Sequence, residues 1–161
     1  PSGPDHPARP ARRRPVALPG GVLDDSLEAA DHLVRVPGVL LLVDGYNVSH
    51  AFWPGQPLVE QRGRLVDALG ELQARTGAAV EVVFDGAVPE APWVEGGRHA
   101  VHVRFSPPDV EADDVLVDVI AAQPPTRPVV LATSDRLLRE RARRLGANLL
   151  GARQLLAAMR R

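Results

Sequence analysis

Acidic residues follow three apolar runs of this 161-residue chain, in the segments LLLVDGYN, VEVVFDG and VLATSD. A fourth acidic group stands in the segment VEADD. The residues concerned are Asp44, Asp85 and Asp135, with Glu111, Asp113 and Asp114 in the fourth group. Carboxylates held close together repel one another unless a cation or protons neutralise them. Mg²⁺ and Mn²⁺ prefer oxygen ligands and keep waters that a substrate phosphate can replace. This chemistry suits hydrolysis of a phosphodiester bond by a metal-activated water.

Alternating strands and helices are expected to position these acids. Continuous apolar runs predict strands at residues 39–43, 80–84, 100–105 and 129–132, with a short last strand at 148–150. Apolar residues at helical spacing predict helices within 24–34, from 58 to about 77, from the VEADD segment onward, over 136–146 and over 154–159. The alternation favours an α/β fold with a doubly wound, mostly parallel sheet.

Ligands of such sheets bind outside the carboxyl ends of the strands. Asp44, Asp85 and Asp135 all fall at that edge, and the helix that VEADD opens should begin there as well. Each site also has a purely structural interpretation. The sequences DGYN and DG are typical of turns, and the acids of VEADD and TSD suit the cap or first turn of a helix. Those interpretations explain one site each, whereas a shared metal site predicts that all of them converge.

Composition excludes several classes of protein. The chain has no Cys, which excludes a disulfide scaffold, a thiol nucleophile and a Cys-ligated metal site. The longest apolar run, VLLLV, is far shorter than a membrane span. The motifs Gly-x-Ser-x-Gly, Walker A and Gly-x-Gly-x-x-Gly are absent from the sequence. We therefore expect a protein without membrane association in a reducing, cytoplasmic setting.

The formal net charge of -1 hides an acidic middle and an Arg-rich end. Residues 1–22 are rich in Pro and Arg and are predicted to form a disordered tail or linker, followed by a domain at 23–161 with its core at 36–161. Arg136, Arg139 and Arg143 share one face of a predicted helix that begins beside Asp135. They are candidates for holding RNA phosphates, and the alternative is a solvated face that complements the helix dipole.

The order of LLVDGYN, VVFDG, VEADD and TSD resembles the NYN branch of the PIN-like nuclease superfamily, and most of all its bacterial YacP-like group, over about residues 36–161. The resemblance implies a Rossmann-like, three-layer PIN-like fold with four to five strands in its sheet. It also implies a Mg²⁺- or Mn²⁺-dependent endoribonuclease. Because the group includes ribosome-associated enzymes, RNA, single-stranded or messenger, and the ribosome are the expected partners.

The resemblance assigns roles to particular residues of this chain. It implies metal ligands at Asp44, Asp113, Asp114 and Asp135, with Asn47 as a polar helper and Asp85, Glu111 and Ser134 as support. Some eukaryotic relatives carry another acid four residues after the last ligand, where this chain has Arg139. That difference leaves one and two metal ions as alternatives.

Two other functions are compatible with the same residues. One is a catalytically weak RNA- or ribosome-binding module, because a fold does not guarantee an activity. The other is a phosphatase or a DNA nuclease that uses the same carboxylates. The sequence specifies no oligomeric state and no RNA sequence preference.

Overall fold

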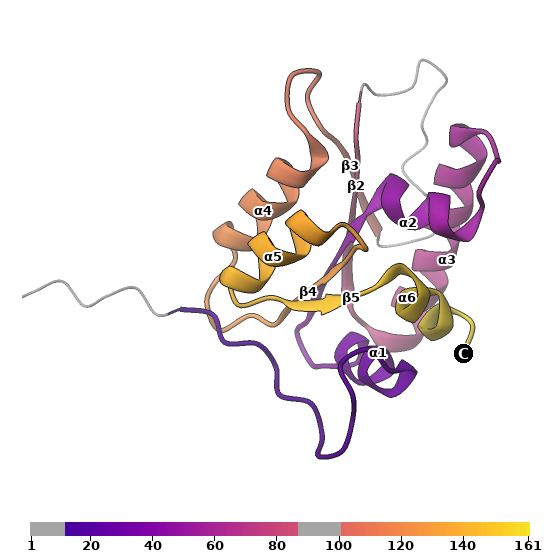
Figure 1. Ribbon diagram of the computed structural model, residues 1–161. Coiled ribbons are helices and arrows are strands. Elements are labelled where there is room, and N and C mark those ends of the chain that lie inside the picture. Colours follow the sequence, from indigo (N-terminus) through magenta and orange to yellow (C-terminus); the bar gives the residue numbers. More distant parts are fainter. Residues whose placement is uncertain (1–11, 87–100) are drawn as a thin grey trace, which may run out of the picture.

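A computed structural model of the chain describes residues 12–86 and 101–161 and is built on one central five-stranded sheet (Figure 1). Its strands are β1 (Leu40–Asp44), β2 (Ala79–Phe84), β3 (Val101–Phe105), β4 (Val129–Ala132) and β5 (Asn148–Leu150). The spatial order is β3-β2-β1-β4-β5, and every neighbouring pair is parallel. This confirms the predicted α/β class. Of the predicted third strand, residues 101–105 are seen, and residue 100 lies outside the described part.

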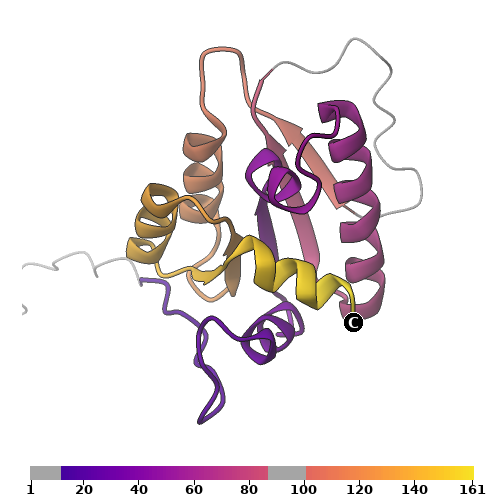
Figure 2. The ribbon, with the colours of Figure 1, turned by 45° about the vertical axis from the view of Figure 1, so that its right-hand side comes forward.

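The sheet separates two apolar cores, so the molecule has three layers (Figure 2). Along β1, Leu41 and Val43 belong to one core and Leu40 and Leu42 to the other. This explains why the central strand reads as an unbroken apolar run. The first core is covered by α1 (Leu27–Val34), α2 (Gly45–Phe52), α3 (Leu58–Thr76) and α6 (Ala152–Met159), and the second by α4 (Ala112–Ala122) and α5 (Arg136–Arg144).

Helix α2 is the one described helix that the sequence patterns did not predict. Instead of forming a turn, the DGYN segment ends β1 at Asp44 and begins this helix at Gly45. Gly45 is required there by packing, because a Cβ atom at this position would lie 2.4 Å from the Phe84 ring and 2.8 Å from the Val83 carbonyl oxygen. The Tyr46 ring then packs 5.0 Å from the Phe84 ring, measured between centroids. Close contact with β2 therefore determines the conformation of this motif.

Residues 12–22 contain no helix or strand, yet part of this segment is bonded to the domain. The Arg13 guanidinium donates to main-chain carbonyls at the C-terminal end of α4 and beyond it, at Ile120, Gln123, Pro124 and Arg127. The Asn148 side chain accepts from Val16 N at 2.7 Å and donates to Val16 O at 2.9 Å. Val16 and Leu18 also pack against the core.

Residues 13–18 thus lie on the domain, although their composition predicts a disordered tail or linker over residues 1–22. The expectation rested on local composition, whereas the partners that hold the segment are more than 100 positions away in the sequence. Residues 1–11 of the expected tail lie outside the described part of the chain. Among the helices described, none combines the length and the apolar character that a membrane span needs.

Candidate active site

The acidic residues come together at the carboxyl edge of the sheet, as the sequence predicts. Asp44 is the last residue of β1, Asp85 follows β2, and Asp135 lies just beyond β4. Asp113 belongs to the first turn of α4. The negative charges of Asp113, Asp135 and Asp85 each raise the pKa of Asp44, which places all three within electrostatic reach of this carboxylate.

Asp44 is the most buried of these acids, with 8% of its surface exposed. Burial is the largest effect on its carboxyl group and raises its pKa to about 6, well above the ordinary value of 3.8. A hydrogen bond from Thr133 acts in the opposite direction, and the neighbouring acids add to the upward shift. A carboxylate in this position gains from a nearby cation, because a cation offsets both the lost hydration and the repulsion.

Thr133 is a part of the site that the sequence motifs do not identify. Its side chain is fully buried, and its hydroxyl donates to Asp44 Oδ2 at 2.8 Å. The Thr133 hydroxyl oxygen in turn accepts a hydrogen bond of 3.1 Å from Asp135 N. Thr133 therefore ties the end of β1 to the start of α5. The available signal was a hydroxyl residue placed directly between a buried strand and a helix-capping aspartate.

Asp135 caps helix α5. Its Oδ1 atom accepts a hydrogen bond of 2.9 Å from Leu138 N. The other oxygen, Oδ2, forms no hydrogen bond within the described residues. The structural interpretation of TSD is thus correct for one oxygen of this carboxylate. The second oxygen is available to a ligand, so capping and ligand binding are compatible at this residue.

The two acids of the VEADD pair point to different partners. The pKa of Asp113 is raised by burial first and then by the charges of Asp135 and Glu111, so this side chain belongs to the acidic cluster. Asp114 instead accepts a hydrogen bond of 2.9 Å from the Arg141 side chain on α5. Consecutive residues of a helix differ by about 100° in direction, which accounts for the divergence. The structure therefore brings Asp113, and not Asp114, toward Asp44.

Asn47 and Ser134 form part of the framework of the site. Asn47 Oδ1 accepts a hydrogen bond of 2.8 Å from Ser134 N, and Ser134 Oγ accepts one of 3.2 Å from Ala152 N. These bonds join α2, the loop after β4 and the first turn of α6. The Asn47 amide nitrogen has no hydrogen-bond partner within the described residues, so it can donate to a bound group.

Asp85 is held at the margin of the cluster. Its Oδ1 atom accepts a hydrogen bond of 3.0 Å from the buried Ser106 hydroxyl, which itself accepts from Gly86 N. Glu111 provides the backbone cap of α4, and its side chain forms no capping bond. Both residues act on the site electrostatically. The charge of Asp85 raises the pKa of Asp44, and the charge of Glu111 raises the pKa of Asp113.

The acidic cluster is an incomplete metal site within the described residues. No group of three or more His, Cys, Asp or Glu side chains in residues 12–86 and 101–161 is placed to hold a metal ion. The donor set nevertheless suits a hard divalent cation, because Mg²⁺ commonly takes one or two carboxylates and completes its shell with waters and substrate phosphate. Asp44 fits this chemistry best, with Asp113 and Asp135 as its neighbours.

Arginines of α5 continue the surface beyond Asp135. Arg136 and Arg143 are exposed, and Arg139 is half-buried and donates to Thr133 O at 2.9 Å. Burial lowers the pKa of Arg139, and the charge of Arg143 lowers it further. Arg143 also lies 3.5 Å from Glu140. The helix therefore presents positive charge next to the acidic cluster, as the sequence predicts.

Comparison with known proteins agrees with this arrangement. The family model of the YacP-like NYN domain matches residues 41–161. The chain is 30% identical to Rae1 (YacP) from Bacillus subtilis, whose crystal structure gives a TM-score of 0.65 with 75% of this chain and 73% of that one covered. A Trp-to-Leu mutant of that protein gives 0.62, at 30% identity, with 75% and 74% covered. A search of curated proteins found no match.

Proposed function

Since the chain belongs to the family of YacP-like NYN domains, we propose that it is a metal-dependent endoribonuclease. The NYN domain is a nuclease-type, RNA-related domain. The observation that carries the proposal is the buried Asp44 carboxylate at the carboxyl end of β1. The negative charges of three other acids raise its pKa. A buried anion among anions is unfavourable unless a cation joins it, and a divalent cation is what phosphodiester hydrolysis uses.

We assign the metal-holding role to Asp44, Asp113 and Asp135. Mg²⁺ or Mn²⁺, when bound, would activate a water, orient the phosphate and offset charge on the leaving oxygen. Thr133 keeps the Asp44 carboxylate in place through its hydrogen bond. Asp114 would have to leave its ion pair with Arg141 to become a ligand, so we assign it a supporting role.

The substrate would be held by donors that border the acidic cluster. The Asn47 amide nitrogen, Arg136 and Arg139 are the groups that would contact phosphate oxygens of the RNA. Arg136 is exposed at the start of α5, directly after Asp135. Arg139 is fixed by its bond to Thr133 O, so its guanidinium is held beside the same strand end. Charge-assisted hydrogen bonds from arginine to phosphate are among the stronger polar contacts in proteins.

A cleavage assay tests the proposal. Labelled single-stranded RNA is incubated with the protein and Mg²⁺, Mn²⁺ or EDTA, with Asp44→Asn and the matched control Asp67→Asn, an exposed aspartate on α3, run in parallel. We expect internal cuts that need the metal, that are lost in Asp44→Asn and that persist in Asp67→Asn. Equal cleavage by Asp44→Asn and the unsubstituted protein would refute the assignment.

Specific observations also favour the alternative of a catalytically weak RNA-binding module. Asp135 uses one oxygen as a helix cap, Asp114 is engaged by Arg141, and no group of three ligands is preformed among the described residues. RNA binding without cuts under every metal condition would support this alternative. DNA of the same sequence and a phosphate monoester, added to the same assay, separate an RNA-specific nuclease from a DNA nuclease and from a phosphatase.

We further propose messenger RNA on the ribosome as the natural substrate and the cytoplasm as the location. The family resemblance and the arginines of α5 support this extension. Purified translating ribosomes provide the test. Cuts in ribosome-bound messenger that exceed those in the free RNA are expected, and equal cleavage of the two would argue against a role for the ribosome.

A further inference from the structure

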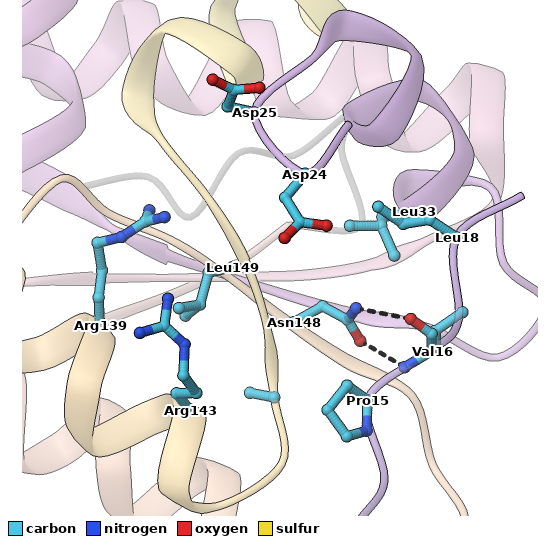
Figure 3. Close-up of a pocket in the computed structure, with 11 residues that line it drawn as sticks. Pro15, Val16, Leu18, Asp24, Asp25, Leu33, Arg139, Arg143, Asn148 and Leu149 are labelled. Atoms are coloured by element: carbon cyan, nitrogen blue, oxygen red, sulfur yellow. Dashed lines mark hydrogen bonds between the residues drawn. The ribbon is translucent and has the colours of Figure 1, made fainter. Parts of the chain in front are cut away.

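A cavity of about 390 Å³ lies beside the edge strand β5, outside the acidic cluster (Figure 3). Its walls come from α5, from β5, from the docked residues 15–18 and from the turn that precedes α1. The residues that matter here are Asp24, Arg139, Arg143, Leu18 and Leu149. The volume falls in the range of roughly 300–1,000 Å³ that is usual for sites that take small organic groups.

Opposite charges face this cavity from different sides. The Arg139 and Arg143 guanidinium groups extend from α5, and the Asp24 carboxylate extends from the turn across the opening (Figure 3). No ion pair crosses the cavity among the described residues, and Asp24 takes part in none. Arg143 has an exposed partner in Glu140, and exposed pairs of this kind are weak. A ligand with an anionic part and a hydrogen-donating part would therefore satisfy both walls.

The basic wall is bonded directly to the candidate active site. Arg139 donates to Thr133 O at 2.9 Å, and the Thr133 hydroxyl donates to Asp44 Oδ2 at 2.8 Å. Arg139 consequently belongs to both places. A phosphate held by this guanidinium would therefore lie near the end of β4, where Thr133 contacts Asp44 of the acidic cluster.

The acidic wall is fixed to the same edge by a second route. Gln154 Nε2 donates to Asp24 O at 2.8 Å and to Ser26 O at 3.0 Å, while Gln154 Oε1 accepts from Gly151 N at 2.9 Å. Ala152, the next residue, donates to Ser134 Oγ. The turn that carries Asp24 is thus held in place relative to the loop after β4. Such support from surrounding residues is what a selective site requires.

On the basis of the proposed ribonuclease function, we propose that this cavity is a specificity subsite that binds a guanine nucleotide of the RNA. Guanine presents N1–H and N2–H side by side, and one carboxylate can accept both. Adenine and cytosine place a single amino group beside a ring nitrogen that repels a carboxylate, and uracil has one N–H between two carbonyls. These groups lie on the Watson–Crick edge of the base, and unstacked RNA bases are commonly recognised by hydrogen bonds to this edge. Asp24 reads guanine, Arg139 and Arg143 hold its phosphate, and Leu18 and Leu149 contact the ring.

Nucleotide binding tests the subsite without any cleavage. The full chain, in EDTA, is titrated with GMP, IMP, AMP, CMP and UMP, and its amide resonances are followed by NMR. GMP is expected to bind roughly tenfold or more tighter than AMP or CMP, the discrimination usual for one bidentate contact. IMP, which lacks the N2 amino group, should lie between them. The largest chemical-shift changes should be those of the Asp24 and Leu149 amides. Equal affinities for the five nucleotides would overturn the proposal.

Matched variants identify the groups involved. Asp24→Asn should reduce GMP affinity to the level of AMP, whereas Asp67→Asn should not. Arg143→Gln should weaken every nucleotide alike, whereas the exposed Arg153→Gln should have no effect. Asp24 is exposed and its bonded group is the main-chain carbonyl, so its substitution leaves the turn intact.

The two proposals fail in different ways. Metal-dependent RNA cleavage together with unselective nucleotide binding would overturn the subsite and leave the nuclease standing. Selective GMP binding that Asp24→Asn abolishes, in a protein that cuts no RNA, would support the subsite and refute the nuclease.

Discussion

The Thr133 hydroxyl donates a hydrogen bond of 2.8 Å to the Asp44 carboxylate and so joins the ends of two neighbouring strands, β1 and β4. Both side chains are buried. The bond stabilises the charged form of Asp44, whose pKa burial and neighbouring acids push upward. Because the same hydroxyl oxygen accepts from Asp135 N, one side chain positions two of the candidate metal ligands.

Removal of this donor should impair the site more than the fold. Thr133→Val keeps the shape of the side chain but loses the hydroxyl, so the pKa of Asp44 should rise further and the cleavage rate should need a higher pH. The unfolding free energy should fall by about 1 kcal/mol, the usual net contribution of a hydrogen bond. Thr133→Ser retains the donor and should restore the pH profile. Identical pH–rate profiles for the Val and Ser variants would contradict this role.

Asp44→Asn should stabilise the metal-free protein at neutral pH. In the folded protein the pKa of Asp44 is about 6, above its ordinary value of 3.8, so folding disfavours the charged form. Stability from this group is therefore fully present below about pH 4, declines as the pH rises toward 6 and is lost above it. Asp44→Asn has no titrating carboxyl at this position and does not lose this stability. Its free energy of unfolding should exceed that of the unsubstituted protein by up to about 3 kcal/mol above pH 7.

Urea unfolding in EDTA between pH 4 and 8 measures this difference. The gap between the two proteins should widen as the pH rises, and a constant gap would show that Asp44 titrates normally. Mn²⁺ should raise the unfolding midpoint of the unsubstituted protein and leave that of Asp44→Asn unchanged, because a ligand stabilises only the form that binds it.

The paired acids of α4 should differ sharply in function. Asp113→Asn removes a carboxylate that faces the cluster, so cleavage should fall by more than the roughly 10- to 100-fold that loss of a group supporting a metal ligand typically costs. Asp114→Asn breaks an exposed ion pair with Arg141 and should change stability by less than about 1 kcal/mol, with cleavage largely kept. Cleavage rates of the two variants at saturating Mn²⁺ make the comparison. A greater loss in Asp114→Asn would reverse the assignment.

Gly45→Ala should destabilise the protein and disturb Asp44. The added Cβ would lie 2.4 Å from the Phe84 ring and 2.8 Å from a main-chain oxygen, so the strand and the helix must separate. Overpacking of this kind costs about 1–3 kcal/mol. Gly63→Ala on α3 meets no atom within 4 Å and should stabilise its helix by about 0.5–1 kcal/mol. Thermal unfolding of the two variants should therefore shift in opposite directions.

Much of the candidate site could be predicted because strand periodicity and helix caps are local properties of a sequence. The apolar runs at 39–43 and 129–132 identify buried parallel strands, and an acid after such a strand must stand at the sheet edge. Asp44 and Asp135 were placed correctly at that edge for this reason. Helix α2 escaped prediction because its N-cap Asp44 and its first three residues spell DGYN, whose local preference is a turn.

The sequence alone determined the α/β class, the edge of the sheet at which the acids gather and the family to which the chain belongs. Only the tertiary structure decided which carboxylate is buried, which of Asp113 and Asp114 faces it, and that Thr133 connects Asp44 to Asp135. It also decided that Arg13 holds the N-terminal segment on α4. Burial, side-chain direction and long-range hydrogen bonds depend on atoms far apart in the sequence, and local patterns carry no information about them.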